Sequence, residues 1–244
     1  MEVITSLDNK RIKNVSKLLN KKYRDEENKF LIEGEHLVEE AYKAGILLEV
    51  YQCEDMGRTF DVPTTYVTYD VIKKLSNTIS PQKIVGVCKK IEEKELGNKV
   101  LILDDIQDPG NLGTIIRSSV AFGIDSIVLS NNTVDLYNDK VLRSSEGMIF
   151  HINIVRRDII DTIDKLHELG YEILGTSVDV GMYVDKVELT NRYALIMGNE
   201  GNGVHAEVLD MCDNYIYIPM KNNVESLNVA VATSIILYEF NKRG

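Results

Sequence analysis

The sequence is poor in the two residue types that disulfide frameworks and metal sites need. It has three cysteines, which lie far apart and form no Cys-x-x-Cys pair. An odd number of separated cysteines favours buried, reduced thiols over a disulfide framework or a zinc cluster. The four histidines show neither His-x-x-x-His nor His-Glu-x-x-His spacing. We therefore expect no metal site built from neighbouring residues of the sequence.

Long apolar runs are also missing. No window approaches the roughly 18 consecutive apolar residues of a membrane-spanning helix. The stretch MEVITSLDNKRIKNVSKLL at the start of the chain is polar from its first residues and lacks the apolar core of a secretory signal. The sequence therefore predicts no membrane partner and a cytoplasmic location.

Basic residues are outnumbered, with 28 Lys and Arg against 38 Asp and Glu and a net charge of -10. This balance argues against a protein coated in nucleic acid. One segment differs, because no acid occurs between Asn9 and Arg24. Its basic residues are Lys10, Arg11, Lys13, Lys17, Lys21, Lys22 and Arg24. By charge alone, the segment is either a solvated helical face or a strip that contacts phosphates.

Strand and helix patterns alternate along the chain, which predicts an α/β fold. FLIEGEHLVEEAYKAG indicates a strand, a turn at Gly34 and a helix ended by Gly45. ILLEVYQC, TTYV and KIVGVCKKI indicate further strands, and YDVIKKLS a short helix. The charged segment 92–99 has no apolar period. We interpret it as the boundary between a small domain, residues 1–95, and a larger one, residues 96–244.

The larger domain contains a second alternating series. VLILDDI, DSIVLS, YEILGTS, YALIMGN and NYIYIPM indicate strands. The first lacks the two-residue alternation of a half-exposed strand, as expected of a parallel strand buried on both faces. Helices are predicted in NLGTIIRSSVAFG up to Gly123, in RDIIDTIDKLHELG up to Gly170, and from about Glu225 to Phe240.

Three of these strands run into loops rich in glycine, amide and carboxylate groups. The loops are residues 106–113, 199–203 and 221–228. Ligands of open parallel sheets bind outside the carboxyl ends of the strands, so the three loops together favour a site. The patterns GxxxxGK[ST], GxGxxG and GxSxG are absent. A nucleoside-like ligand, held by backbone amides and carbonyls without a phosphate cradle, fits these loops best.

Two arginines lie in helical stretches that are otherwise mostly apolar or small. They are Arg117, in TIIRSSV, and Arg143, in KVLRSSEGMIF. Arginine is seldom buried without a partner. Each is either a side chain that reaches a surface carboxylate or a guanidinium aimed at a phosphate or carboxylate ligand.

Three blocks of the sequence resemble the three motifs of the SpoU (TrmH-type) RNA ribose 2′-O-methyltransferases of the SPOUT superfamily. They are LDDIQDPGNLGTIIRSSVAFG, ALIMGNEGNGV and IYIPMKNNVESLNVAVA, in this order. LRSSEGMIFHI resembles a further block between the first two. FLIEGEHLVEEAYKAG and TISPQKIVGV resemble the N-terminal substrate-binding domain of the rRNA-modifying branch. The resemblance covers nearly the whole chain.

The resemblance implies an α/β SPOUT domain tied into a deep trefoil knot, after a small α/β substrate-binding domain. It implies S-adenosylmethionine as cofactor, no metal, and a homodimer. The implied reaction is methyl transfer to a ribose 2′-hydroxyl of RNA, with 23S rRNA favoured over tRNA. A tRNA methyltransferase or an antibiotic-resistance rRNA methylase of the same family is the alternative. An inactive, dimeric RNA-binding protein is the alternative of another class.

The resemblance also assigns residues. The implied catalytic positions are Asn111, Arg117, Glu200, Ser226 and Asn228. The implied cofactor-binding positions are Gly198, Asn199, Glu200, Ile218, Met220 and Leu227. The RNA-binding candidates are Lys10, Arg11, Lys13, Arg117 and Arg143. A guanidinium stays protonated at ordinary pH, so we expect Arg117 to clamp an RNA phosphate and stabilise an alkoxide, rather than act as a base.

The last motif carries three further predictions about the final helix. Ser226 is predicted to cap the helix, because its side chain can reach a first-turn amide. Asn222 and Asn223 are predicted to form the preceding turn. One apolar stripe is expected to be buried by the knot and the dimer partner. The stripe consists of Leu227, Ala230, Val231, Ile235 and Tyr238.

Overall fold

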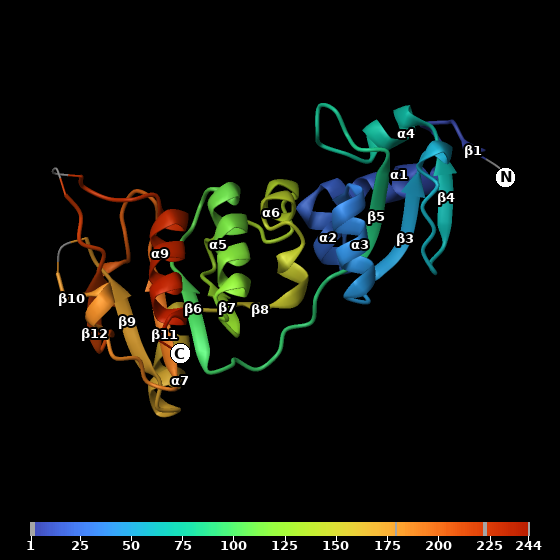
Figure 1. The fold of residues 1–244 in the computed structure, drawn as a ribbon. Helices are drawn as coiled ribbons and strands as arrows, with labels where there is room; N and C mark the ends of the chain where they lie inside the picture. Colours follow the sequence, from blue (N-terminus) through green and yellow to red (C-terminus); the bar gives the residue numbers. More distant parts are fainter. Residues whose placement is uncertain (1–2, 179, 222–223, 244) are drawn as a thin grey trace. The chain divides into compact units, whose positions relative to one another are not determined.

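The structure, a computed structural model, describes residues 3–178, 180–221 and 224–243, so the predicted turn at Asn222 and Asn223 lies outside the described residues. The chain forms two compact units (Figure 1). The first unit comprises Met1–Glu92 and Asp135–Phe150, and the second comprises Glu93–Val134 and His151–Gly244. The chain first passes from the first unit to the second between Glu92 and Glu93, within the charged segment that the sequence indicated. No sequence pattern marked its return to the first unit at Asp135. A division into two domains at 95/96 stays a prediction.

The described part of the first unit contains a five-stranded mixed sheet. Its strand order is β1-β4-β3-β5-β2. The strands are β1 (Val3–Ile4), β2 (Lys29–Glu33), β3 (Leu47–Gln52), β4 (Thr64–Val67) and β5 (Ile84–Lys89). β5 is antiparallel to both β2 and β3, whereas β4 is parallel to β1 and β3. The strands predicted in this half of the chain are confirmed.

Helices pack on this sheet through apolar side chains. They are α1 (Lys10–Ser16), α2 (Lys21–Glu27), α3 (Glu35–Lys43), α4 (Tyr69–Lys74) and α6 (Asp139–Ser144), with short 3-10 turns η1 (Lys17–Leu19) and η2 (Glu54–Met56). Ile12 of α1 and Ile72 of α4 share one core with Tyr51 and Val85 of the sheet. The predicted turn at Gly34 is confirmed between β2 and α3, and Gly45 follows α3 with a φ of 69°.

An ion pair joins residues 135–150, which return to the first unit after a part of the second, to the rest of the first unit. Arg24 of α2 is 8% exposed, and its guanidinium pairs with Asp135. The same guanidinium donates to the carbonyls of Leu18 and Leu19, at 3.0 and 2.8 Å. Removing one partner from such a pair leaves a buried charge uncompensated. Arg24 therefore serves the fold, rather than the phosphate-contacting strip that the sequence left open.

The second unit, over its described residues, forms a seven-stranded parallel sheet. Its strand order is β10-β12-β9-β11-β6-β7-β8. The strands are β6 (Lys99–Leu103), β7 (Ser126–Leu129), β8 (Asn153–Arg156), β9 (Glu172–Thr176), β10 (Met182–Tyr183), β11 (Tyr193–Met197) and β12 (Asn214–Tyr217). The five strands predicted here are confirmed, and all recorded pairings are parallel.

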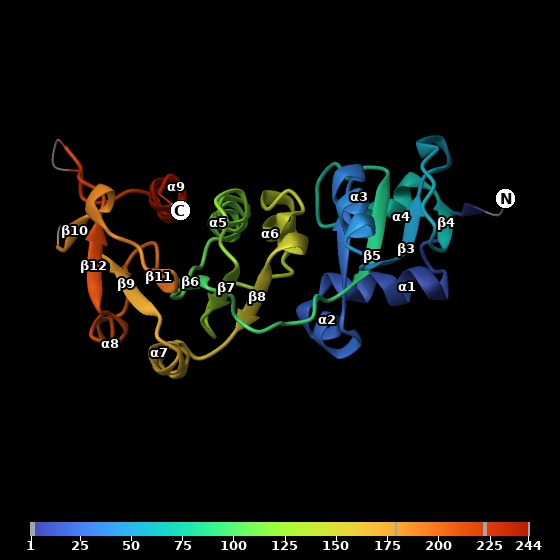
Figure 2. The same ribbon diagram turned by 60° about the horizontal axis from the view of Figure 1, so that its bottom comes forward.

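Helices cover both faces of this sheet. They are α5 (Pro109–Ala121), α7 (Ile159–Glu168), α8 (Ala206–Leu209) and α9 (Val229–Asn241), with 3-10 turns η3 (Met148–His151) and η4 (Val184–Lys186) in the chain around them. Figure 2 shows α5 and α9 on one side of the strands, and α7 and α8 on the other. Val100 and Ile102 pack with α7, so Leu101 and Leu103 point to the opposite face. Tyr193 makes an edge-on ring contact with Phe240 of α9.

The fold class is therefore α/β, as predicted. The trefoil knot stays a prediction at this level of description. None of the helices in the described ranges is long and apolar enough to span a membrane. The predicted ends of α5 and α7 are confirmed within two residues, and Gly123 and Gly170 follow them with φ values of 73° and 77°.

Candidate active site

The loops after β9, β11 and β12 line one pocket at the carboxyl edge of the parallel sheet, and the loop after β6 is not part of its lining. The pocket has a volume of about 400 Å³, within the range of small-molecule sites. Apolar side chains from β11, α8 and α9 form part of its wall. All six cofactor-binding candidates line it, namely Gly198, Asn199, Glu200, Ile218, Met220 and Leu227. Ser226, one of the catalytic candidates, lines it as well.

The loop after β11 folds tightly back on itself. The backbones of Asn199 and Gly203 exchange two hydrogen bonds, of 2.9 and 3.0 Å. The Asn199 side-chain oxygen accepts from the amides of Gly201 and Asn202, at 2.9 and 3.1 Å. A Cβ at Gly198 would lie 2.1 Å from the backbone of Gly203, so only glycine fits there. The turn thus keeps its shape through its own hydrogen bonds, and its residues line the pocket.

Glu200 connects this loop to the first motif. One of its carboxylate oxygens accepts from the Asn111 side chain and the Asp108 amide, both at 3.0 Å. The other accepts from the Gln107 amide at 3.1 Å. Burial alone would raise the pKa of Glu200, but these hydrogen bonds outweigh it and lower the pKa. The carboxylate is therefore held in its charged form as an acceptor.

Asn228 connects the third motif to the same group. Its side-chain nitrogen donates to the side-chain oxygen of Asn111 at 3.0 Å. Its own oxygen accepts from the amides of Ala230 and Val231, at 2.9 and 3.3 Å. Asn228 thus caps α9, which begins at Val229. The prediction that Ser226 caps a helix starting near Glu225 is wrong, because the chain stays extended until the Asn228 amide oxygen can meet the first free amides.

We expect Glu200→Gln to lower the melting temperature by about 2–6 °C. In the variant, an NH2 group replaces one of the two carboxylate oxygens of Glu200. This donor then faces the N–H groups of Asn111 or Gln107. The melting temperature of the purified variant measures this loss. Glu207→Gln, an exposed acid in the same unit, should melt like the parent chain. An unchanged melting temperature in Glu200→Gln would contradict the role assigned to the carboxylate.

The two arginines singled out by the sequence differ in their surroundings. Arg117 lies on the exposed side of α5 and makes no hydrogen bond or ion pair within the described ranges. Arg143, in α6 of the first unit, donates to Asp139 at 2.5 Å. Arg117 therefore has a guanidinium free for a ligand, whereas Arg143 already has a carboxylate partner.

Most of the basic segment is matched by acids that lie elsewhere in the sequence. Arg11 donates to Glu49 at 2.5 Å and to the Tyr51 hydroxyl at 2.8 Å. Lys13 pairs with Asp8 at 2.7 Å. Lys21 and Lys22 lie within 4 Å of the acids one helical turn further on. Lys10 is exposed and has no such partner in the described chain. The segment carries less free positive charge than its sequence suggested.

Beside the site, the structure shows a histidine–aspartate pair that no sequence pattern indicated. The imidazole of His205 lies 2.8 Å from the carboxylate of Asp104, which also accepts from the His205 amide at 2.9 Å. Asp104 is 3% exposed, and its hydrogen bond raises the pKa of His205. Asp105 brings a third potential ligand atom within 4.8 Å of the other two. His205 lies 101 residues from Asp104, so no local spacing could reveal the pair.

The class that this geometry defines is an α/β enzyme with a ligand pocket at the carboxyl edge of its sheet. The chain belongs to the SpoU rRNA Methylase family, whose sequence model matches residues 98–238. A second family model, the MRM3-like substrate binding domain, matches residues 9–86. The resemblance read from the three motifs is thereby confirmed.

Known proteins similar to the chain agree with this family. A 23S rRNA (guanosine(2553)-2′-O)-methyltransferase, RlmP of Bacillus subtilis, is 42% identical and aligns over 98% of both chains. The AdoMet-bound rRNA methyltransferase of Sinorhizobium meliloti superposes with a TM-score of 0.86, at 28% identity over 99% of this chain and 97% of that one. A TrmH/SpoU tRNA modifying enzyme of A. aeolicus reaches a TM-score of 0.53 at 26% identity, over 62% of this chain and 77% of its own.

Proposed function

We propose that the protein transfers a methyl group from S-adenosylmethionine to a ribose 2′-hydroxyl of 23S rRNA. We propose as its target the nucleotide that corresponds to guanosine 2553, on which the Bacillus subtilis relative acts. The observation that carries the proposal is the hydrogen-bonded group of Asn111, Glu200 and Asn228, which joins three motifs next to a ligand-sized pocket. An rRNA substrate also implies that the reaction takes place in the cytoplasm.

The residues of the pocket fit S-adenosylmethionine. Gly198 lets the backbone of Gly203 and Val204 approach closely, because a Cβ there would clash with it, and residues 198–203 line the pocket. Ile218 and Leu227 would hold the ligand largely through backbone groups, with Met220 beside them. When bound, S-adenosylmethionine supplies an electrophilic methyl group on a sulfonium. The protein's own contribution is binding, orientation and exclusion of water.

Arg117 and the polar residues of the site would position the ribose 2′-oxygen and make it a better nucleophile. The free guanidinium of Arg117 binds the phosphate next to the reacting ribose and stabilises negative charge on the 2′-oxygen. It does so as a permanent cation, so the hydroxyl proton leaves through a neighbouring group or water. Asn111 and Asn228, fixed by Glu200 and by the α9 cap, orient the sugar, and Ser226 offers a further hydroxyl at the pocket.

Labelling with radioactive S-adenosylmethionine tests the proposal. Total RNA from cells that lack the protein is incubated with it, and the labelled nucleotide is mapped by its resistance to alkaline cleavage. We expect one 2′-O-methylated position in 23S rRNA. Label in tRNA would favour the alternative substrate. Cofactor binding without any labelled RNA would favour an inactive binding protein, and absence of cofactor binding would refute the proposal.

We also propose that the active form is a homodimer with a trefoil knot in each second unit, as family membership implies. An exposed apolar groove supports the dimer. It is lined by Thr114, Ala230, Val231, Ser234, Ile235 and Tyr238. Val231 and Tyr238 are 49% and 50% exposed, so the predicted apolar stripe of α9 is covered only in part by its own chain. Light scattering of the purified protein should give twice the chain mass, and a monomer would contradict the proposal.

A further inference from the structure

The loop between α4 and β5, residues 76–83, is fixed by one carboxylate. Glu33, the last residue of β2, accepts from the Thr78 hydroxyl at 3.0 Å and from the Gln82 amide at 2.9 Å. It also accepts from the Ser76 hydroxyl, whose oxygen in turn accepts from the Thr78 amide at 2.9 Å. Three donors from one short loop thus converge on a single side chain. The loop therefore has a defined shape before any partner binds.

The far end of the loop is fixed as well. The side chain of Gln82 packs so closely on Gly34 that a Cβ there would lie 2.9 Å from it, and Gly34 has a φ of 101°. The Gln82 side-chain oxygen accepts from the Glu35 amide at 3.3 Å. The Tyr69 hydroxyl donates to the carbonyl of Pro81 at 3.1 Å. Both ends of the loop are thus anchored, with residues 79 and 80 between them.

This anchored loop presents an isoleucine entirely to water. Ile79 is 100% exposed, whereas the next most exposed large apolar side chains in the described chain, Leu169 and Val180, reach 59%. Burial of an isoleucine side chain against a partner is favourable, because it removes apolar area from water. Single exposed apolar side chains are common on protein surfaces, but one that is fully exposed on a loop of fixed shape offers apolar area that a partner can cover. Apolar wedges of this kind insert between nucleic-acid bases.

The stretch of sequence that contains the loop is rich in lysine. Residues 71–91 contain no Asp or Glu, although the whole chain has a net charge of -10. The basic residues of this stretch are Lys73, Lys74, Lys83, Lys89 and Lys90. Lys73, Lys83 and Lys90 pair with acids from outside the stretch. Pairs on the surface contribute little and can exchange a carboxylate for an RNA phosphate.

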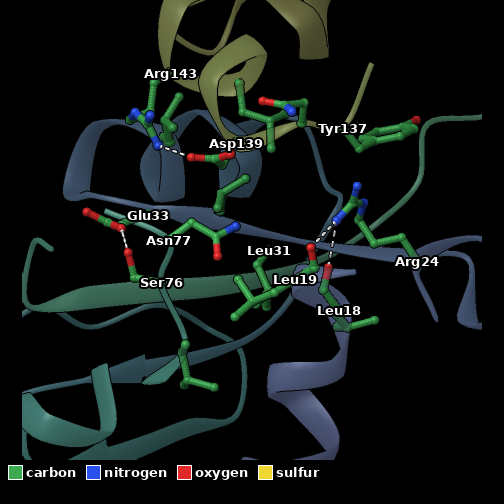
Figure 3. Close-up of a pocket in the computed structure, with 15 residues that line it drawn as sticks. Leu18, Leu19, Arg24, Leu31, Glu33, Ser76, Asn77, Tyr137, Asp139 and Arg143 are labelled. Carbon is green, nitrogen blue, oxygen red and sulfur yellow. Dashed lines mark hydrogen bonds and ion pairs between the residues drawn. The ribbon is translucent and has the colours of Figure 1, made fainter. Parts of the chain in front are cut away.

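A small pocket opens beside the first residues of the loop (Figure 3). Its volume is about 100 Å³, which is room for several water molecules. Its apolar wall consists of Leu18, Leu19, Leu31, Ile32, Leu37, Leu75 and Leu142. The Asn77 side chain lies between Leu31 and Asp139 in Figure 3 and makes no hydrogen bond within the described residues. A free amide can pair with the edge of an unstacked base.

We propose that the loop 76–83 and this pocket bind one unpaired nucleotide of the substrate RNA, other than the nucleotide that is methylated. The base of this nucleotide leaves the stack of RNA bases, enters the pocket and pairs with Asn77. Ile79 packs against the neighbouring bases that stay stacked. The flanking lysines contact the phosphates of the bound nucleotide. The inference rests on the proposed RNA substrate. It is supported by the match of residues 9–86 to a substrate-binding domain, because this match includes the whole loop.

Steady-state methylation of a 23S rRNA transcript tests the inference. We expect Ile79→Ala and Asn77→Ala each to raise KM at least about fivefold, with kcat changed less than twofold, because only RNA binding loses a contact. Cofactor affinity and melting temperature should not change. Leu169→Ala, which removes a similarly exposed side chain from the second unit, is the matched control and should leave both kinetic constants unchanged.

Direct RNA binding separates this inference from the proposed function. Gel-shift titration of the same transcript should show the weaker affinity of both variants whether or not methyl transfer occurs. Unchanged KM and unchanged affinity in Ile79→Ala and Asn77→Ala would overturn the inference and leave the proposed function intact. A parent chain that binds the transcript but transfers no methyl group would refute the proposed function alone. A parent chain that does not bind it would refute both.

Discussion

Replacing Arg117 by alanine is expected to lower kcat for RNA methylation by about 100- to 1000-fold, the usual cost of losing one group that stabilises a developing oxyanion. The structure gives this side chain no competing partner within the described residues, and it lies on the helix that begins at the Asn111 group. Cofactor affinity should stay within a few-fold of the parent, because Arg117 does not line the cofactor pocket. Single-turnover methylation and calorimetric titration of S-adenosylmethionine measure the two quantities separately.

Two outcomes would contradict this assignment. A large loss of cofactor affinity in Arg117→Ala would place the guanidinium in the cofactor site, and an unchanged kcat would remove it from the reaction. Arg157→Ala is the matched control, since it removes a half-buried arginine from the same unit at a position away from the pocket lining. We expect its kcat to stay within twofold of the parent value.

Gly198→Ala is expected to abolish measurable cofactor binding and to lower the melting temperature by about 4 °C or more. Its new methyl group would lie 2.1 Å from the backbone carbon of Gly203 and the amide nitrogen of Val204. Backbone atoms cannot move aside as a flexible side chain does, so the turn that closes through Asn199 and Gly203 must open. Thermal melting and titration with S-adenosylmethionine follow the two effects.

Gly201 provides a control for the stability effect in the same turn. A Cβ at this position would meet only the Asn199 side-chain oxygen, at an ordinary contact distance of 3.6 Å. Gly201→Ala should therefore melt within about 1 °C of the parent chain. If both variants melt alike, the turn tolerates a Cβ at Gly198, and the expected steric clash with Gly203 and Val204 is contradicted.

The sequence predicted the elements that local chemistry defines. Gly34, Gly45, Gly123 and Gly170 were predicted as turns or helix ends, and all four have positive φ values, which side chains with a Cβ rarely adopt. The apolar run of VLILDDI predicted a parallel strand buried on both faces, and β6 lies in the interior of the sheet. Such features depend on a few neighbouring residues, so a single sequence is enough to identify them.

The sequence failed where the partner comes from far along the chain. Arg11 and Lys13 looked like free positive charge, because Glu49 and Asp8 stand outside the basic segment. Ser226 and Asn228 are both good caps, and they are distinguished by the start of α9 at Val229, where the Asn228 side-chain oxygen accepts from the amides of Ala230 and Val231. The pairing of Asp104 with His205, and of Arg24 with Asp135, likewise joins residues about a hundred positions apart.

The candidate site lies between these two cases. Composition and loop chemistry indicated a nucleoside-like ligand at the carboxyl ends of three strands. Two of these loops, 199–203 and 221–228, contribute residues to one pocket, whereas the loop 106–113 reaches it only through hydrogen bonds to Glu200. The individual assignments of Asn111, Glu200 and Leu227 came from motif resemblance, because no periodicity distinguishes a catalytic amide from an ordinary turn residue. The structure adds the link between Asn111 and Glu200, a carboxylate that accepts from both backbone and side chain.

The strand order of the second unit also governs when the protein can fold during synthesis. β6 leaves the ribosome early, but one of its edges pairs with β11, where Lys99 meets Tyr193. Until β11 emerges, β6 has an apolar edge without a pairing strand. Few contacts then compensate for the entropy that is lost when long-range parallel strands pair. The first unit likewise lacks its residues 135–150 until more than half of the chain has been made. Completion of both cores is thus a late event, and the nascent chain must be kept from aggregating until then.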